Sequence, residues 1–187
     1  DFKVDYSPIN GGIIDLGRFG ELGSRGVLAL MADSTNAERP GYTPTERKVG
    51  VSFDKLFAEA EGRRIIIATF SSNIHRVQQI INCAERTGRK VAVFGRSMVN
   101  VISIARELGY LEVNENTIID IDLMNRYSAE KIVLITTGSQ GEPMSALTRM
   151  AMGDHKKVNI TPQDFIIISA TPIPGNEKYV TRVVNEL

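Results

Sequence analysis

The stretch "RIIIATFSSNIHRVQQIINCAERTGRKVAVFG" (residues 64–95) decides the fold class. It begins with a continuous apolar run, 64–70, and passes through a polar turn into residues 73–88, where apolar side chains recur at helical spacing. A second apolar run, 90–95, follows directly. Apolar runs without alternation are typical of strands covered on both faces, and a helix between two of them is typical of a parallel β-α-β unit.

The same alternation continues to the end of the chain. It predicts a mostly parallel α/β sheet with helices on both faces and right-handed crossovers. Segment 114–130 interrupts the pattern, and we interpret it as an irregular excursion between strand units. The remaining expected elements are a helix over 97–109 with Ser97 as its cap and Gly109 as its stop, strands over 131–137 and 164–170, and helices over 142–153 and 176–187.

The first part of the chain has a different character. Residues 26–36 are predicted to form a strand that ends in a polar cluster, and 39–50 a turn-rich connection into a helix that ends near Gly62. The sequence begins with Asp1 rather than methionine and has no targeting character, so we interpret it as part of something longer. No apolar run approaches the roughly 18 residues that a membrane span needs.

Composition excludes several functional classes. The 22 basic and 22 acidic side chains cancel, so only a local basic surface could attract nucleic acid. The single cysteine, Cys83, rules out an internal disulfide, fits a reducing cytosol and is predicted to be a buried structural thiol. The sequence lacks the dinucleotide fingerprint, the P-loop and the paired histidines or cysteines of a zinc site, so it cannot supply a complete zinc site alone.

Polar loops follow the predicted strands at 71–76, 95–98, 137–143 and 171–177. In open α/β sheets, ligands bind where such loops lead into helix N-termini, whose free N–H groups suit phosphate. Loop 71–76 offers Ser72 or Asn73 as a helix cap. His75 and Arg76 are either solvated or ligand-binding, and a cation in a first helical turn favours an external anionic partner. His155 is predicted to be a surface residue.

The loop "TGSQGEP" (137–143) has two interpretations. Ser139 and Glu142 have the spacing of a capping box, and Pro143 could instead occupy the first helical position. Neither cap explains Gly138 and Gly141, which would keep the backbone open to an anion. The residues alone leave both interpretations open. If the second holds, Gly138→Val is expected to leave the fold stable.

Six stretches together resemble the ribonuclease J family of metallo-β-lactamase/β-CASP nucleases. They are "DFKVDYSP", "ADSTNAERPGYTPTER", "ATFSSNIHRVQQII", "GRKVAVFGRSMVN", "TTGSQGEPMSALTRMA" and "IISATPIPGNEK", and they cover nearly the whole chain in order. The resemblance implies that residues 1–36 are the tail of a metallo-β-lactamase domain and 37–187 a β-CASP domain. It also implies two zinc ions bridged by Asp1, and a catalytic role for Asp33. The family's histidine-rich zinc motif is absent, so this part alone is expected to be inactive.

The resemblance further implies 5′→3′ exonuclease and endonuclease activity on single-stranded, 5′-monophosphorylated RNA, in rRNA processing and mRNA decay. It implies a cytoplasmic homo-oligomer that is not bound to membranes. One alternative is a non-catalytic nucleotide or sugar-phosphate binding domain, and another is a β-CASP relative that acts on DNA or on mRNA 3′ ends. The residues implied in RNA or phosphate binding are Ser71, Ser72, Asn73, His75, Arg76, Gly138, Ser139, Gln140, Gly141 and Glu142.

Overall fold

The computed structural model describes residues 3–34 and 36–187. The chain divides into two compact units, Asp1–Val51 and Ser52–Leu187. The second unit contains one five-stranded sheet in the order β3-β2-β4-β1-β5, in which every pair of neighbours is parallel. This confirms the predicted parallel α/β sheet. The strands are β1 (Arg64–Ala68), β2 (Lys90–Phe94), β3 (Ile118–Ile119), β4 (Ile132–Thr136) and β5 (Asp164–Ile168).

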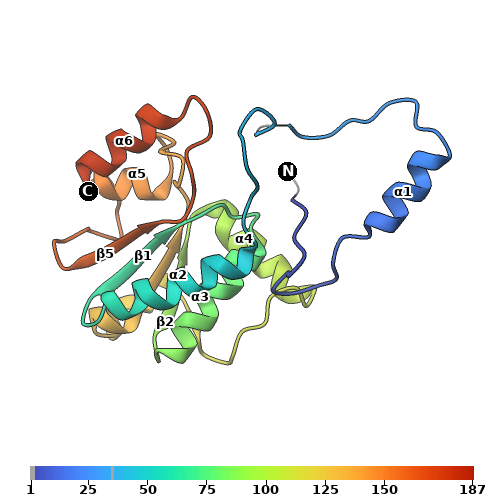
Figure 1. Ribbon diagram of the computed structural model, residues 1–187. Coiled ribbons are helices and arrows are strands. Elements are labelled where there is room, and N and C mark those ends of the chain that lie inside the picture. The colour runs from blue at the N-terminus through green and yellow to red at the C-terminus, as the bar shows by residue number, and fades with distance from the viewer. Residues whose placement is uncertain (1–2, 35) are drawn as a thin grey trace. The chain divides into compact units, whose positions relative to one another are not determined.

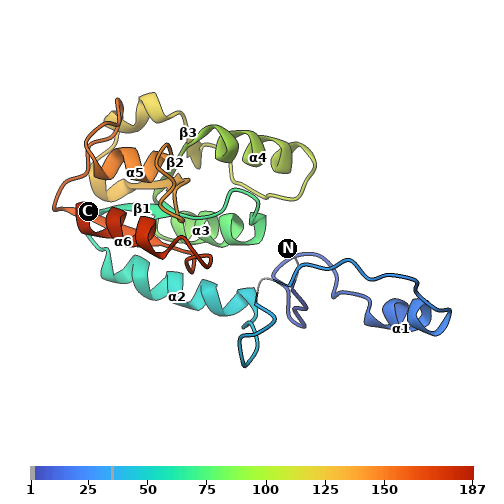
Figure 2. The same cartoon turned by 90° about the horizontal axis from the view of Figure 1, so that it is seen from above.

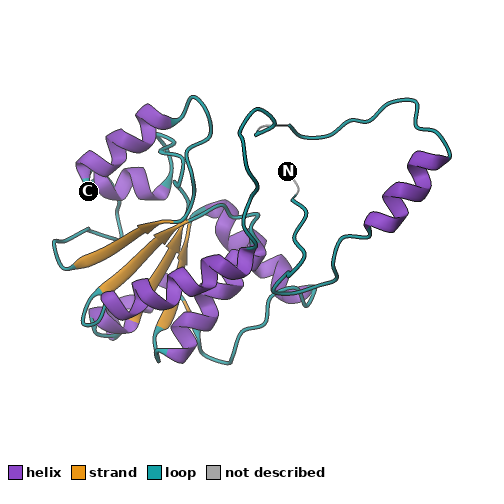
Figure 3. Cartoon of the chain, viewed as in Figure 1, coloured by secondary structure: helices purple, strands orange, loops and turns teal. Residues whose placement is uncertain are grey.

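Helices cover both faces of this sheet (Figures 1 and 3). One face carries α5 (Ala146–Ala151) and α6 (Glu177–Glu186), and the opposite face carries α3 (Ile74–Arg86) and α2 (Glu46–Glu59). Both α3 and α4 (Arg96–Glu107) pack against β2, as the view in Figure 2 shows. The sequence between β2 and β4 forms the short strand β3 and two 3-10 turns, η1 (Ile121–Arg126) and η2 (Ala129–Lys131).

The core lies along the two central strands. All five residues of β4 are buried, as are Ile65 to Ala68 of β1, so their side chains are covered on both faces. One core cluster joins Ile66 and Leu134 to Leu147 and Met150 of α5 and to Val183 of α6. The half-buried ion pair between Arg64 and Asp164, 2.6 Å from Nη2 to Oδ2, joins the first residues of β1 and β5. The continuous apolar runs in the sequence are therefore the consequence of two-sided burial.

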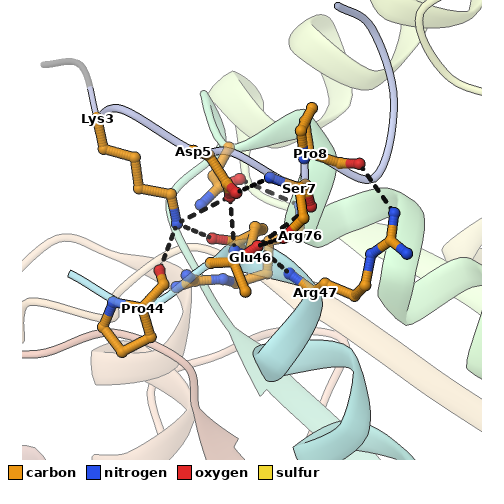
Figure 4. Close-up of polar contacts among 10 residues, drawn as sticks. Lys3, Asp5, Ser7, Pro8, Pro44, Glu46, Arg47 and Arg76 are labelled. Carbon is orange, nitrogen blue, oxygen red and sulfur yellow. Dashed lines mark hydrogen bonds and ion pairs between the residues drawn. The ribbon is translucent and has the colours of Figure 1, made fainter. Parts of the chain in front are cut away.

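The first unit contains α1 (Leu16–Ser24), which Asp15 caps by accepting a hydrogen bond from the Arg18 N–H at 2.9 Å. Figure 4 shows residues 3–8 beside residues 44–47 of the same unit. Asp5 Oδ2 accepts from the Glu46 N–H at 2.8 Å, while Oδ1 accepts from the Ser7 N–H at 3.0 Å. These hydrogen bonds lower the pKa of Asp5 to about 2, and the contact with Glu46 is the largest cause.

Two predictions of secondary structure outside loop 137–143 are wrong. Residues 27–34 form no strand, and Leu28, Leu30 and Met31 are exposed. A strand needs a hydrogen-bonded neighbour, and the described part of the first unit provides none. Ser97 is not a cap either: α4 begins at Arg96, its N-cap is Gly95 at φ +105°, and no side chain caps it.

Candidate functional site

The four polar loops lie at one edge of the sheet. Because β1, β2, β4 and β5 are parallel, the loops that follow them share the carboxyl edge, as predicted. Contacts join them to one another. The Arg76 Nη1 donates to the carbonyl of Ser169 at 2.8 Å, and a Cβ on Gly95 would lie 2.8 Å from the Thr137 hydroxyl. The loop after β1 therefore lies beside the loop after β5, and the loop after β2 lies beside the loop after β4.

The centre of this edge is a topological switch point. The adjacent strands β1 and β4 lead into α3 and α5, which pack on opposite faces of the sheet. The two following loops therefore diverge, and ligands of open α/β sheets bind in the crevice that such a divergence creates. Loops 71–76 and 137–143, on which the sequence resemblance places the RNA-binding residues, flank this point.

Loop 137–143 does not cap a helix in the predicted way. Helix α5 begins only at Ala146, and its N-cap is Ser145, whose hydroxyl accepts from the Thr148 N–H at 3.5 Å. The capping box of Ser139 and Glu142 is therefore wrong, and so is the placement of Pro143 at a first helical position. Ser139 is a buried loop residue, with 2% of its surface exposed, and it precedes the first residue of α5 by seven positions.

The glycines of this loop make room for protein atoms. Gly138 has φ +109°, and a Cβ there would lie 2.5 Å from the Ser145 Oγ. Gly141 has φ +70°, and a Cβ there would lie 2.4 Å from the carbonyl carbon of Tyr179 in α6. The interpretation that these glycines keep the backbone open, and that Gly138→Val would leave the fold stable, is therefore wrong. The role of the loop in phosphate binding remains a prediction.

Gln140 connects this loop to the one that precedes α6. Its side chain is buried, with 3% exposed. Its Nε2 donates to the carbonyl of Thr171 at 3.1 Å, and its Oε1 accepts from the Ile173 N–H at 2.7 Å. Both ends of the amide thus bind backbone of the neighbouring loop, which no local sequence pattern indicates.

Loop 71–76 leads into α3 as predicted. Asn73 is the N-cap, and its Oδ1 accepts from the Arg76 N–H at 3.1 Å. Ser72 and His75 are exposed, whereas Ser71 and Arg76 are half-buried. This loop therefore presents a hydroxyl and an imidazole to solvent at the helix N-terminus, where backbone N–H groups and the helix dipole favour anions.

His155 was predicted to lie on the surface, and this is wrong because it is 4% exposed. Its ring packs edge-on against Phe94, with 4.2 Å between centroids, and Nδ1 accepts from the Val158 N–H at 3.0 Å. The buried Nε2 has no hydrogen-bond partner among the described residues. Burial lowers the pKa of His155, and the charges of Arg149 and Lys157 lower it further. The charged residues on either side of His155 in the sequence suggested an exposed position, so its burial could not be predicted from them.

Cys83 is buried, as predicted. Burial, the largest cause, and the neighbouring Asp54 carboxylate together raise the pKa of its thiol to about 12, against the opposing effect of Arg86. The Sγ donates to Asp54 Oδ1 at 3.4 Å. A thiol with this pKa stays protonated at neutral pH and is a poor nucleophile or metal ligand.

The roles predicted for Asp1 and Asp33, in metal binding and catalysis, remain predictions. Asp1 lies outside the described residues, and Asp33 is an exposed residue of the first unit. Within residues 3–34 and 36–187, no three His, Cys, Asp or Glu side chains are grouped so that they could hold a metal ion. The described residues therefore do not fit a two-zinc centre by themselves.

Comparison with known proteins identifies a family whose model covers this sheet and its loops. The family model described as "Ribonuclease J, beta-CASP domain" matches residues 62–187, which include the whole sheet and all four loops. The chain belongs to the ribonuclease J family. Over all 187 residues it is 44% identical to ribonuclease J of Synechocystis, 48% to that of Helicobacter pylori strain 26695 and 48% to that of Mycolicibacterium smegmatis.

The match covers the whole chain but only part of each relative. The 187 residues correspond to 29% of the Synechocystis ribonuclease J, 27% of the Helicobacter pylori protein and 33% of the Mycolicibacterium smegmatis protein. The chain therefore spans about a third or less of these relatives. Among the described residues, no helix is long and apolar enough to cross a membrane.

Proposed function

We propose that the carboxyl edge of this β-CASP sheet binds the sugar-phosphate backbone of single-stranded RNA in a metal-dependent ribonuclease. The observation that carries the proposal is the meeting of four polar loops at the switch point between β1 and β4. Membership of the ribonuclease J family supports RNA as the ligand. Phosphate contacts at helix N-termini fix the position of a strand without reading its sequence, which suits a processing or decay enzyme.

Burial divides the predicted contact residues into two groups. Ser72, His75 and Glu142 are exposed, so their side chains can reach a ligand, whereas Ser139 and Gln140 are buried within the protein. We propose that the side chains of Ser72 and His75, at the N-terminus of α3, donate to phosphate oxygens. A 5′-monophosphate carries more negative charge than an internal phosphodiester, so the same donors would favour a monophosphorylated end.

The activities of the whole protein belong to this proposal. We propose 5′→3′ exonuclease and endonuclease action in RNA maturation and decay, in a cytoplasmic homo-oligomer with two zinc ions. Because the described residues provide no group of metal ligands, we derive no catalytic step from them. Their part is to bind and orient the RNA, and the isolated 187-residue chain should not hydrolyse it.

The test is a binding measurement on the full-length protein that carries this chain. The double substitution Ser72→Ala and His75→Ala should weaken binding of a 5′-monophosphorylated oligoribonucleotide by about a hundredfold, because two hydrogen bonds to charged oxygens, about 1.5 kcal/mol each, are lost. The matched control is Ser103→Ala with Arg106→Ala, two exposed residues of α4 distant from its N-terminus. Equal affinities of the double variant and the unmodified protein would refute the proposed surface.

A further inference from the structure

The loop between β5 and α6, residues 169–176, is held from two sides. On one side, Arg76 donates to the carbonyl of Ser169 at 2.8 Å. On the other, the Gln140 amide binds the carbonyl of Thr171 at 3.1 Å and the N–H of Ile173 at 2.7 Å. Loop 169–176 therefore connects Arg76 on one side of the switch point to Gln140 on the other side.

Gln140 also forms a hydrogen bond at the beginning of α6. Its Oε1 also accepts from Nδ2 of Asn176, the N-cap of that helix, at 3.4 Å. The next residue, Gly141, lies directly against the backbone of Tyr179 and Val180. Residues 140 and 141 together hold both the loop and the first turns of α6.

We infer that Gln140 is a positioning residue for RNA binding: it acts through loop 169–176 on Arg76 and does not contact RNA itself. Its amide is 3% exposed and its donor and acceptor are both engaged by backbone, so it has little left to offer a phosphate. Without it, Thr171 and Ile173 lose their partners, and the loop keeps its attachments at Ser169, whose N–H donates to the Ala68 carbonyl at 2.8 Å and whose carbonyl accepts from Arg76. The chain that follows Ser169 is then free to move, so the orientation of the Ser169 carbonyl toward Arg76 is less firmly fixed.

The consequence for RNA rests on the proposed function, whereas the consequence for loop order does not. The informative substitution is Gln140→Met, because methionine fills a similar volume and makes no amide hydrogen bonds. Gln140→Glu keeps the acceptor for the Ile173 N–H and loses the donor to the Thr171 carbonyl, so it retains only one of the two hydrogen bonds. Gln163→Ala is the matched control, as Gln163 is exposed and lies at the opposite end of β5.

The first measurement is hydrogen exchange of the peptide that covers residues 169–176, in the full-length protein. Gln140→Met should raise exchange at the Ile173 amide by about tenfold, the factor expected for one lost hydrogen bond, and Gln140→Glu should restore part of the protection. Gln163→Ala should change nothing there. Unchanged exchange in Gln140→Met would overturn the inference, and so would faster exchange throughout the second unit.

The second measurement is RNA affinity in a double-mutant cycle. Gln140→Met should weaken binding several-fold on its own and have little further effect in the Arg76→Met background, because both substitutions interrupt one connection. Additive effects would show that Gln140 does not act through Arg76 and would overturn the inference. If Ser72→Ala with His75→Ala leaves affinity intact while Gln140→Met still loosens the loop, the proposed RNA surface fails and the structural connection stands.

Discussion

A glycine can be required because its backbone has a positive φ or because a Cβ would collide with neighbouring atoms. Replacing Gly141 by alanine, beside a control that has only the positive φ, separates these two reasons. At φ +70° a side chain is strained whatever surrounds it, and a Cβ at this position would also lie 2.4 Å from the carbonyl carbon and 2.5 Å from the carbonyl oxygen of Tyr179. The chain offers a matched control in Gly153, which has φ +73° with no atom within 4 Å of its Cβ position. The two substitutions therefore share the backbone strain and differ in the collision.

The expected magnitudes follow from this difference. The left-handed conformation costs a residue with a Cβ about 1–2 kcal/mol, so Gly153→Ala should destabilise the second unit by about that amount. In Gly141→Ala the obstacle is the backbone of Tyr179 and Val180, so α6 itself must shift. Overpacking of this kind costs about 1–3 kcal/mol more. The total for Gly141→Ala should then be about 2–5 kcal/mol.

Urea unfolding followed by far-ultraviolet circular dichroism measures both changes in free energy. The reasoning requires Gly141→Ala to exceed Gly153→Ala by at least about 1 kcal/mol, the lower end of the overpacking cost. Equal destabilisation would refute the contact with α6. A further result would refute it in another way: if Gly141→Ala left stability unchanged and abolished RNA binding, the glycine would serve an open, ligand-facing backbone.

Three titratable groups give further predictions. His155 binds backbone N–H groups in its neutral form and its folded pKa is lowered, so its stabilising contribution should be present above pH 6.5 and lost below it. His155→Gln should flatten that part of the stability–pH curve in urea unfolding. Cys83, whose pKa is raised to about 12, should resist a thiol reagent at pH 8 until urea exposes it. The Asp5 carboxyl should titrate near pH 2 by NMR, and Asp5→Asn should speed exchange of the Glu46 amide.

The sheet could be predicted because its signal is local to each strand. In β1 and β4 nearly every residue is buried, so the apolar runs in the sequence correspond directly to the strands. The run at 27–31 has a similar composition, yet it is exposed and forms no strand. Its composition gives no information on whether a neighbouring strand is there to pair with it.

The details of the site depended on contacts that no local pattern contains. Ser139 and Ser145 are both acceptable helix caps by residue type, and the structure uses Ser145. Ser139 is unsuitable because the loop it belongs to turns inward under α6 before the helix begins. His155 was misjudged for the same reason: the ring of Phe94, far away in sequence, buries it.

The pair Gly138 and Gly141 shows how a motif can be located correctly and explained wrongly. Glycines beside a helix start are equally required when a ligand approaches the backbone and when the protein does. Here the atoms that exclude a Cβ belong to Ser145, Leu147 and Tyr179 of the chain itself. Direct phosphate contacts are therefore better sought among the exposed groups around the switch point, such as Ser72 and His75. The glycine loop can contribute by holding α6 and loop 169–176 in place, so its conformation can matter to RNA binding without direct contact.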